Sequence, residues 1–292
     1  MKMKLNLSKL LLIIGIVIPC LVQATTIEQL TKLESSFGGR IGVYAINTAN
    51  DEKIDYRVNE RFPMCSTAKV MVCGAILKDS MKNSDLLQKT IQYAQKDIVV
   101  WSPITEKHVT TGMTISELCA AAIDYSDNTA MNLLIKQLGS PQAVTKFARS
   151  IGDKIFRLDR WETELNSAIP GDVRDTTTPV EMAKSLQKLT FGNVLGISQR
   201  EQLQTWLKEN TTGATRIRAG VPKGWIVGDK TGGGAYGTNN DIAIIWPPKC
   251  PPIIVAIYTT QTKPDAAPND KIIAEVTRIV LNELAPIEMC AN

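Results

Sequence analysis

The sequence predicts an α/β fold of the α+β type, in which one antiparallel sheet is flanked by helices and an all-helical segment is inserted between its strands. Strand-like runs occur only near the two ends of the chain, whereas residues 61–210 carry almost entirely helical patterns. Because both ends supply strands and the middle supplies helices, the economical arrangement is one sheet built from both ends. A functional site is then expected in the crevice between the sheet and the inserted helices.

The elements follow from local signals in chain order. Ile27–Ser36 has helical periodicity and ends at Gly38, and residues 40–47 and 53–57 alternate like a hairpin around a polar turn. The last part of the chain predicts strands over residues 225–230, 241–246 and 253–260, and then a helix over residues 270–284. In the middle, capping boxes and first-turn prolines predict helix starts: Thr114 with Glu117, Thr178 with Glu181, Ser198 with Glu201, and Pro141 and Pro179.

These patterns divide the chain into a leader and two subdomains. Residues 25–60 and 211–292 are expected to form a discontinuous α/β subdomain, and residues 61–210 an all-α subdomain. The stretch 157–175 has neither a helical nor a strand period. Long ordered loops of this kind are usually functional, so we expect this loop to contribute to the site.

Residues 1–24 have the pattern of a secretory signal. Three lysines within the first nine residues form a basic start, residues 10–18 are apolar, and residues 22–24 are a small-residue cleavage site. A spanning helix needs about 20 apolar residues, which disfavours a membrane anchor. Pro19 disfavours the other alternative, lipidation at Cys20. Cleavage before Thr25 predicts a periplasmic or secreted protein without a membrane anchor.

Charge and composition argue against several classes of function. Removing the leader removes three lysines and no acid, so the formal charge falls from +4 to +1 and predicts no nucleic-acid or membrane partner. The single histidine, His108, lies in a polar stretch, so neither a Ser-His-Asp triad nor a zinc site is expected. We expect a monomer that acts on a small molecule and uses no metal and no cofactor.

Five cysteines remain after the leader, and export places them in an oxidising compartment. Because the number is odd, at least one thiol stays free. Cys73 and Cys119 both lie on apolar helical stretches and are the first candidate pair. Cys250 precedes the last strand and Cys290 follows the last helix. A helix that runs antiparallel over that strand would end near the strand's start, which predicts a second bridge, Cys250–Cys290.

Four short motifs carry the chemistry. Ser66-Thr67-Ala68-Lys69 places a hydroxyl and an amine three residues apart, on one face if the segment is helical. A serine hydroxyl is a weak nucleophile until a base takes its proton, and a lysine can do so where burial makes its neutral form accessible. This motif is weak alone and becomes strong through three others that follow in order: Ser126-Asp127-Asn128, Glu162-Thr163-Glu164-Leu165-Asn166 and Lys230-Thr231-Gly232.

With these four motifs in this order, the chain resembles the class A serine β-lactamases over essentially its whole length after the leader. The resemblance implies the two-subdomain fold of serine β-lactamases and D,D-peptidases, in agreement with the segregation of strands and helices. It also implies that the chain opens the β-lactam ring of penicillin-type antibiotics and so confers antibiotic resistance.

The resemblance implies a catalytic role for each motif. Ser66 is the nucleophile that forms an acyl-enzyme, and either Lys69 or Glu162 through a water removes its proton. Ser126 relays a proton to the lactam nitrogen. Glu162 then activates the water that releases the acyl group. The N–H groups of Ser66 and Gly233 form the oxyanion hole.

The same resemblance implies the substrate-binding residues. Lys230 and Thr231 supply a cation and a hydroxyl for the substrate carboxylate, and Gly232 allows a close approach to the strand. Asn128 binds Lys69 or the substrate amide. The remaining implied residues are Asn166 as second holder of the water, Arg216 as a second carboxylate-binding arginine, Trp101 as an aromatic gate, and Arg160 with Asp175 as the ion pair that closes the loop. For Trp101, a partly buried core position stays open.

Cys65 marks a departure from one subgroup of that family. A cysteine precedes the nucleophile in some carbapenem-hydrolysing members, where it pairs with a cysteine two positions after the Lys-Thr-Gly motif. Here that position is Gly234, so this bridge cannot form and Cys65 is expected to be a free thiol.

Three other functions stay open at this point. A penicillin-binding D,D-peptidase would use the same serine and lysine, but Glu162 with Asn166 argues against it. A serine glutaminase on a similar fold would release ammonia from glutamine. A non-catalytic exported binding protein would need none of these groups.

Overall fold

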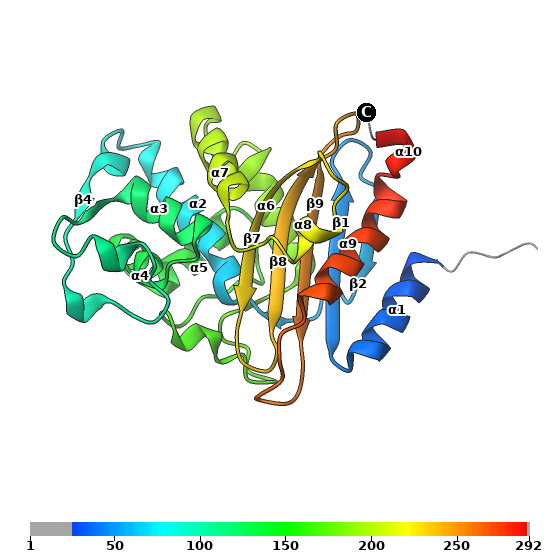
Figure 1. Cartoon of the computed structure of the whole chain (residues 1–292). Helices are drawn as coiled ribbons and strands as arrows, with labels where there is room; N and C mark the ends of the chain where they lie inside the picture. The colour runs from blue at the N-terminus through cyan, green and yellow to red at the C-terminus, as the bar shows by residue number, and fades with distance from the viewer. Residues whose placement is uncertain (1–24, 291–292) are drawn as a thin grey trace, which may run out of the picture.

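The sheet predicted from both ends of the chain is confirmed. In the computed structural model, which describes residues 25–290, one five-stranded antiparallel sheet has the order β2-β1-β9-β8-β7 (Figure 1). The strands are β1 (Arg40–Asn47), β2 (Lys53–Tyr56), β7 (Ile226–Gly233), β8 (Asn239–Trp246) and β9 (Ile253–Thr260). Strand β1 pairs with β9 along its whole length, with Arg40 opposite Thr260. The two ends of the chain therefore meet in the centre of the sheet.

The predicted leader lies outside the described residues. From residue 25 to residue 290, no helix combines the length and the apolar character that crossing a membrane requires.

Helices cover both faces of this sheet, which explains why strands β1, β7, β8 and β9 are buried along almost their whole length. Alternate side chains of a strand point to opposite faces. On β1, Tyr44 and Ile46 join the core under the inserted helices, whereas Val43 and Ala45 join the core under the terminal helices. Helices α1 (Thr26–Phe37) and α9 (Asp270–Leu284) cover the second of these faces, and α6 (Pro179–Thr190) and α7 (Ile197–Glu209) the first (Figure 1).

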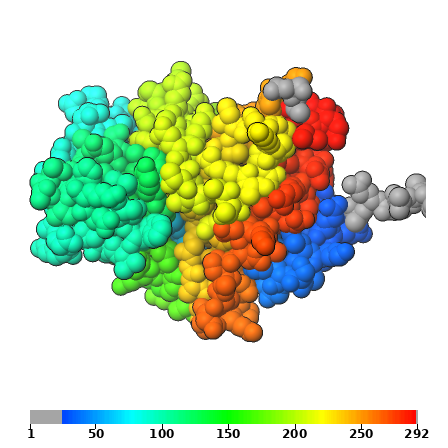
Figure 2. Space-filling model, in the orientation of Figure 1, coloured from blue at the N-terminus to red at the C-terminus, as the bar shows by residue number. Residues whose placement is uncertain are grey.

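The inserted segment forms the helical side of the molecule. Helix α2 (Lys69–Ser80) packs against α3 (Ile115–Asp124), α4 (Asn128–Leu138) and α5 (Pro141–Ser150). In the space-filling view this segment, coloured cyan to green, lies on one side and the blue and red terminal helices lie on the other (Figure 2). Two short helices complete the described chain, α8 (Ile217–Gly220) and α10 (Ile287–Cys290).

The prediction of almost continuous helix over residues 61–210 is wrong for residues 81–114. That stretch contains short 3-10 turns and one two-residue strand pair, β4 (Thr90–Ile91) with β5 (Met113–Thr114). Side chains satisfy its backbone in place of helical hydrogen bonds: the carboxylate of Asp127 accepts from the N–H groups of Ile104 and Thr105 at 3.0 and 2.9 Å. A second short pair, β3 (Phe62–Pro63) with β6 (Thr176–Thr177), joins the start of the inserted segment to the end of the 157–175 loop.

Two of the three predicted capping boxes start helices. Thr114 and Glu117 form a complete box at α3, and the Thr178 side chain accepts from the Glu181 N–H at α6. The third prediction is wrong: α7 begins at Ile197 with Gly196 as its N-cap, and Ser198 bonds the Gln199 side chain instead. Helix α7 therefore starts two residues earlier than the Ser198 signal indicated.

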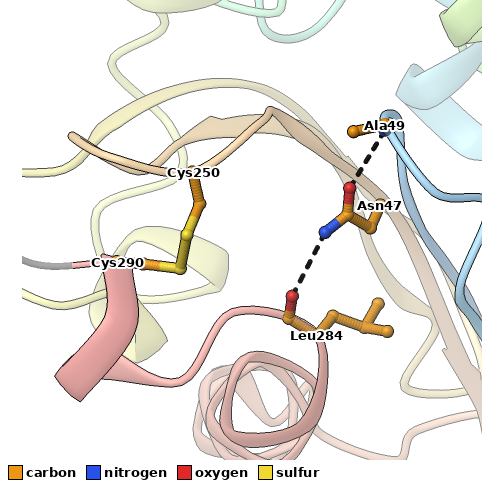
Figure 3. Close-up of a disulfide and its surroundings, with 5 residues drawn as sticks. All are labelled: Asn47, Ala49, Cys250, Leu284 and Cys290. Carbon is orange, nitrogen blue, oxygen red and sulfur yellow. Dashed lines mark hydrogen bonds between the residues drawn. A yellow bond between two sulfur atoms is a disulfide. The ribbon is translucent and has the colours of Figure 1, made fainter.

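One predicted disulfide is confirmed, and the other is wrong. Cys250 and Cys290 are bonded, with Cα atoms 5.1 Å apart, because α9 returns across β9 and brings α10 to the loop before that strand (Figure 3). A neighbouring contact, from the Asn47 side chain to the carbonyl of Leu284 at 3.4 Å, also holds the end of α9 on β1. Cys73 and Cys119 are free buried thiols, and Cys73 Sγ points to the Cys119 carbonyl oxygen, 3.8 Å away, as a weak donor.

Replacing Cys250 and Cys290 by serine should lower the free energy of unfolding by about 2–4 kcal/mol. The bridge closes a loop of 40 residues in sequence, and a loop of this length restricts the unfolded chain strongly. Guanidinium unfolding of the oxidised protein and of the double variant measures the difference. Dithiothreitol should break the bridge in the parent and so lower its free energy of unfolding to that of the double variant. The free energy of unfolding of the variant should not change. Equal unfolding midpoints without reductant would contradict the prediction.

Candidate active site

Ser66 and Lys69 lie side by side at the start of the inserted helices. Ser66 belongs to a 3-10 turn, Cys65–Ala68, that runs directly into α2, whose first residue is Lys69. The three-residue spacing puts both side chains on the same face, as the sequence predicted, and Lys69 Nζ is 2.7 Å from Ser66 Oγ. A hydroxyl and an amine are therefore in direct contact.

Lys69 is fully buried, and its ammonium is surrounded by acceptors. Besides Ser66, it donates to Asn128 Oδ1 at 2.7 Å, to Glu162 Oε1 at 2.9 Å and to the Ser126 carbonyl at 3.0 Å. A buried charge is tolerated only when it is paired and hydrogen-bonded, and these contacts meet that requirement. Lys69 thus connects three of the four sequence motifs.

Ser126 joins Lys69 to the fourth motif. Its Oγ lies 3.0 Å from Lys230 Nζ and 3.3 Å from Lys69 Nζ, so one hydroxyl contacts two amines. The loop that carries it is held by Asp127, which caps α4 by accepting from the Ala130 N–H. Asp127 therefore holds the turn, and its carboxylate also binds the N–H groups of Ile104 and Thr105. This hydroxyl can pass a proton between the serine side and the strand side of the site.

Glu162 is brought to Ser66 by the 157–175 loop. Its carboxylate is buried, with Oε1 3.4 Å from Ser66 Oγ and 2.9 Å from Lys69 Nζ, and Oε2 accepts from Asn166 Nδ2 at 2.5 Å. Asn166 Oδ1 is buried and has no hydrogen-bond partner among the described residues. Glu164, two residues away, is exposed. Of the two glutamates in the motif, only Glu162 is in a position to act on Ser66.

Asn132 positions Glu162, and the sequence reasoning missed it. Its side chain forms a two-sided clamp on the Glu162 backbone, accepting from the N–H and donating to the C=O, both at 2.9 Å. Asn132 lies one helical turn after Asn128 on α4, so both amides face the same side of that helix. This four-residue spacing was the available signal, but nothing in the sequence indicated that the loop would lie against this face.

Arg160 and Asp175 form the ion pair that closes the 157–175 loop. This pair is more buried than an ordinary surface salt bridge. Arg160 Nε is 2.6 Å from Asp175 Oδ2, and Asp175 is fully buried. The second oxygen of Asp175 accepts from the N–H groups of Asp159 and Arg160, and its carbonyl accepts from the Met64 N–H at 2.9 Å. Asp175 thus ties both ends of the loop to each other and to the residue two positions before Ser66.

Strand β7 forms the opposite wall of the site. Lys230 is fully buried on it, and burial, together with the nearby Lys69 ammonium, lowers the pKa of Lys230 well below its usual value. The Thr231 hydroxyl lies 2.6 Å from that of Thr212. At Gly232, a Cβ would come within 2.7 Å of the Met64 carbonyl. The missing side chain there makes room for the protein's own backbone, and Gly233, whose Cβ would meet no atom closer than 4.0 Å, ends the strand in open space.

Arg216 lies against the backbone of β7 and is held in place by Asp270 and by two backbone carbonyls. Its Nε donates to Asp270 Oδ1 at 2.9 Å, and its Nη1 donates to the carbonyls of Gly232 and Asn240 at 3.1 and 2.9 Å. Asp270 also accepts from the side chains of Thr215 and Asn239, and these bonds together with Arg216 lower its pKa against the opposing effect of burial. A charged Asp270 fixes the guanidinium beside Gly232.

Trp101 is exposed at the rim of the site and is not part of the core. Its side chain is 62% exposed, and its indole N–H donates to the Tyr125 carbonyl at 3.1 Å. Its own carbonyl accepts from the Asn128 N–H at 3.0 Å. Val100 and Tyr125 beside it are also exposed, which leaves an apolar rim next to the Ser126 loop. The core alternative for Trp101 is wrong.

Cys65 is a free buried thiol, as expected. Burial raises its pKa far above the usual range of a thiol, and the Glu162 carboxylate adds to that effect. A Cβ at Gly234 would lie 2.7 Å from Cys65 Sγ and 2.6 Å from the Asn166 carbonyl. Gly234 therefore lets the end of β7, the turn that carries Cys65 and Ser66, and the 157–175 loop pack against one another.

In the assembled site, the Ser66 hydroxyl, the Glu162 carboxylate and the Lys69 amine lie within hydrogen-bond reach of one another, and Ser126 Oγ links Lys69 to the second amine, Lys230. Such a set can activate a nucleophile, move protons across Ser126, and retain a base for a second step. All members are fixed by buried contacts to three different elements: the turn before α2, the loop before α4, and the 157–175 loop.

Comparisons with known proteins agree with this geometry. Residues 25–284 match the model of a family described as the beta-lactamase enzyme family. The chain is 56% identical to Beta-lactamase OXY-2 of Klebsiella oxytoca, over 88% of this chain and 89% of the relative. It is 55% identical to Beta-lactamase CTX-M-97 of Escherichia coli, over 88% and 89%. A crystal structure of a beta-lactamase from Desulfarculus baarsii superposes with a TM-score of 0.88 at 50% identity, covering 89% of this chain and 97% of that one.

Proposed function

Because the chain belongs to the class A β-lactamases, we propose that it opens the ring of penicillin-type antibiotics through an acyl-enzyme on Ser66, which a Glu162-activated water then releases. The observation that carries this proposal is the position of the Glu162 carboxylate, buried and 3.4 Å from Ser66 Oγ. A serine enzyme that only acylates needs no second base at this place, whereas one that turns over does.

In the first step, Ser66 Oγ attacks the lactam carbonyl carbon. Its proton passes to the Lys69–Glu162 pair. Lys69 Nζ lies 2.7 Å and Glu162 Oε1 3.4 Å from Ser66 Oγ. Because these two groups contact each other at 2.9 Å, a proton taken by one can pass directly to the other. The N–H groups of Ser66 and Gly233 stabilise the oxyanion, and each such donor contributes about 3 kcal/mol to the transition state.

The lactam nitrogen leaves when it receives a proton. Ser126 Oγ is the donor, since it contacts both Lys69 and Lys230 and can be reprotonated from the Lys69 side. Breaking the carbon–nitrogen bond then yields an ester on Ser66 and a free amine in the opened ring. The substrate carboxylate is bound by Lys230, Thr231 and Arg216, and Asn128 supports Lys69 and the substrate amide.

In the second step, Glu162 takes a proton from a water that attacks the ester carbon. The unpartnered acceptor Asn166 Oδ1, next to the Glu162 carboxylate, supports a place where both side chains hold that water. Ester cleavage returns the proton to Ser66 and releases the opened antibiotic as a carboxylic acid. Asn132 and the Arg160–Asp175 pair keep the Glu162 carboxylate next to Ser66.

Rapid quenching with a penicillin tests the proposal. Mass spectrometry should find the intact mass of the antibiotic added to the peptide that contains Ser66, and this adduct should disappear as substrate is consumed. The Ser66→Ala variant should carry no adduct and show no hydrolysis. A stoichiometric adduct that persists without product would indicate a penicillin-binding peptidase instead.

The affinity for substrate should fall as the pH rises. The fall should begin at a lower pH than it would if Lys230 had the usual pKa of a lysine. The lowered pKa of Lys230 means that its charge is lost as the pH rises through that lowered value, which removes a partner of the substrate carboxylate. KM should therefore rise with pH on the alkaline side. Lys230→Arg keeps the charge, so steady-state kinetics of that variant should show the rise at higher pH or not at all; an unchanged profile would contradict the assignment.

We also propose that the protein works outside the cytoplasm, in the periplasm or secreted. The Cys250–Cys290 bridge supports this location, because disulfides form and persist in oxidising compartments.

A further inference from the structure

A separate cavity of about 520 Å³ lies between the end of the 157–175 loop and the end of the sheet where β1 begins and β9 finishes. Its volume is within the range of small-molecule sites, about 300–1,000 Å³. None of the residues of the four sequence motifs lines it. The mechanism proposed above makes no use of this space.

One wall of the cavity is apolar. Pro63 comes from β3, and Ala168, Ile169, Pro170 and Val173 come from the loop. Ile169 and Val173 are 46% and 49% exposed, although large aliphatic side chains are usually buried. Two branched side chains that line a cavity while half exposed provide a surface for the apolar part of a ligand.

Four charged side chains line the same cavity, and three of them are already neutralised. Arg40 and Glu60 pair at 3.0 Å, and Glu60 has a second partner in Arg57 at 2.7 Å. Asp172 pairs with Arg174 at 2.7 Å. The carboxylates in the lining therefore do not repel an anion as free charges would.

Arg61 is the fourth charged group, and among residues 25–290 no carboxylate lies within salt-bridge distance of it. Its Nη1 donates to the Ile155 carbonyl and to Thr176 Oγ1, both at 3.0 Å, and Thr176 also lines the cavity. No hydrogen bond uses its Nε or Nη2 within the described chain. Arginine presents these donors in a fixed fork that matches a carboxylate.

Arg61 lies near two other arginines, Arg157 and Arg149, of which Arg157 is paired with Asp159 at 2.7 Å. Burial and the nearby Arg157 and Arg149 lower the pKa of Arg61, and Asp153 and Asp159 offset only part of that effect. An anion bound at this position would relieve the repulsion among the three guanidinium groups. Charge complementarity therefore favours a negatively charged ligand over a neutral or cationic one.

We propose that this cavity binds an amphipathic carboxylate, with its anionic head on Arg61 and its aliphatic or aromatic body against Ile169 and Val173. The site is separate from the one that holds the lactam carboxylate, which lies on Lys230, Thr231 and Arg216. The proposal concerns binding alone, so it does not depend on the role given to Glu162 or on the enzymatic reaction.

Octanoate is a suitable probe, with octanamide as the neutral control of the same shape. In ¹⁵N NMR spectra of the full protein after leader removal, octanoate should shift the backbone amides of Gly39, Gly171 and Gln261 in a saturable manner. Octanamide should bind at least about tenfold more weakly, since it lacks the charge-assisted bonds to Arg61. Shifts confined to β7 and the Ser126 loop would show binding in the active site only and would overturn the proposal.

Two variants test the two halves of the site independently. Arg61→Gln removes the charge and keeps a donor for the Ile155 carbonyl, and Ile169→Glu places a carboxylate on an exposed part of the apolar wall. Each should weaken octanoate binding at least about tenfold, and Ile169→Glu keeps the test decisive if Arg61→Gln folds poorly. Arg278→Gln, an exposed arginine paired with Glu275 outside the cavity, should bind like the parent. Unchanged affinity in both cavity variants would refute the proposal.

Discussion

Glu162→Gln should trap the antibiotic on Ser66. Glutamine keeps the size and one acceptor oxygen of the side chain but is not a base at neutral pH. Acylation should persist, because Lys69 still contacts Ser66 Oγ at 2.7 Å. Release of the ester should slow by about 10²–10⁴-fold, the usual contribution of a general base. Acyl-enzyme should therefore accumulate to one equivalent per protein.

Stopped-flow kinetics with a chromogenic cephalosporin separate the two steps, and intact-mass spectrometry identifies the trapped species. Glu164→Gln is the matched control, because it is the same substitution two residues away on an exposed side chain. It should turn over like the parent. Equal loss of acylation and release in Glu162→Gln would show that this carboxylate also governs the first step. Normal turnover would remove its assigned role.

Lys69→Met should reduce both activity and stability. The ammonium contacts Ser66, Ser126, Asn128 and Glu162, so its loss removes the partner of the nucleophile and should slow acylation by about 10²–10⁴-fold. It also leaves the buried Glu162 carboxylate without its ion-pair partner. Breaking a buried pair from one side costs about 3–5 kcal/mol, so the free energy of unfolding should fall by about that amount.

The double variant Lys69→Met/Glu162→Gln separates the two effects. Removing both charges leaves no unpaired ion in the site, so most of the lost stability should return while activity stays low. Urea unfolding of the parent, both single variants and the double variant gives the coupling energy. Lys82→Met is the control for the substitution itself, since Lys82 is exposed just beyond the same helix. Additive losses in the double variant would mean that the pair contributes nothing as a unit.

The relative positions of side chains in the site could be predicted where local geometry determines them. Ser66 and Lys69 are three residues apart on one helical turn, so any fold that keeps this turn brings them together. The Cys250–Cys290 bridge followed from similar reasoning, since a helix that returns over an adjacent strand must end near its start. The Cys73–Cys119 prediction used weaker grounds: two apolar helices that pack together bring thiols close without orienting the sulfur atoms toward each other.

Contacts between distant segments could not be predicted in this way. Asn132 is one of several amides on α4, and its clamp on Glu162 exists only because the 157–175 loop lies against that helix. The carboxylate of Asp127 satisfies backbone groups at residues 104 and 105, which keeps a stretch with helical composition irregular. The cavity at Arg61 likewise forms between distant segments, since the Arg61–Thr176 hydrogen bond joins residues 115 positions apart in the chain.

The sequence by itself determined the class of fold and the chemical groups of the site. Strand patterns at both ends predicted one shared sheet, and the resemblance carried by the four motifs implied a serine, a lysine and a carboxylate as the reacting set. Only the tertiary structure decided how Asn132 holds Glu162, how deeply Asp175 is buried, and that Arg61 lines a cavity without a carboxylate partner among the described residues. The physical reason is that periodicity and spacing act over a few residues, whereas burial and charge pairing depend on which segments pack together.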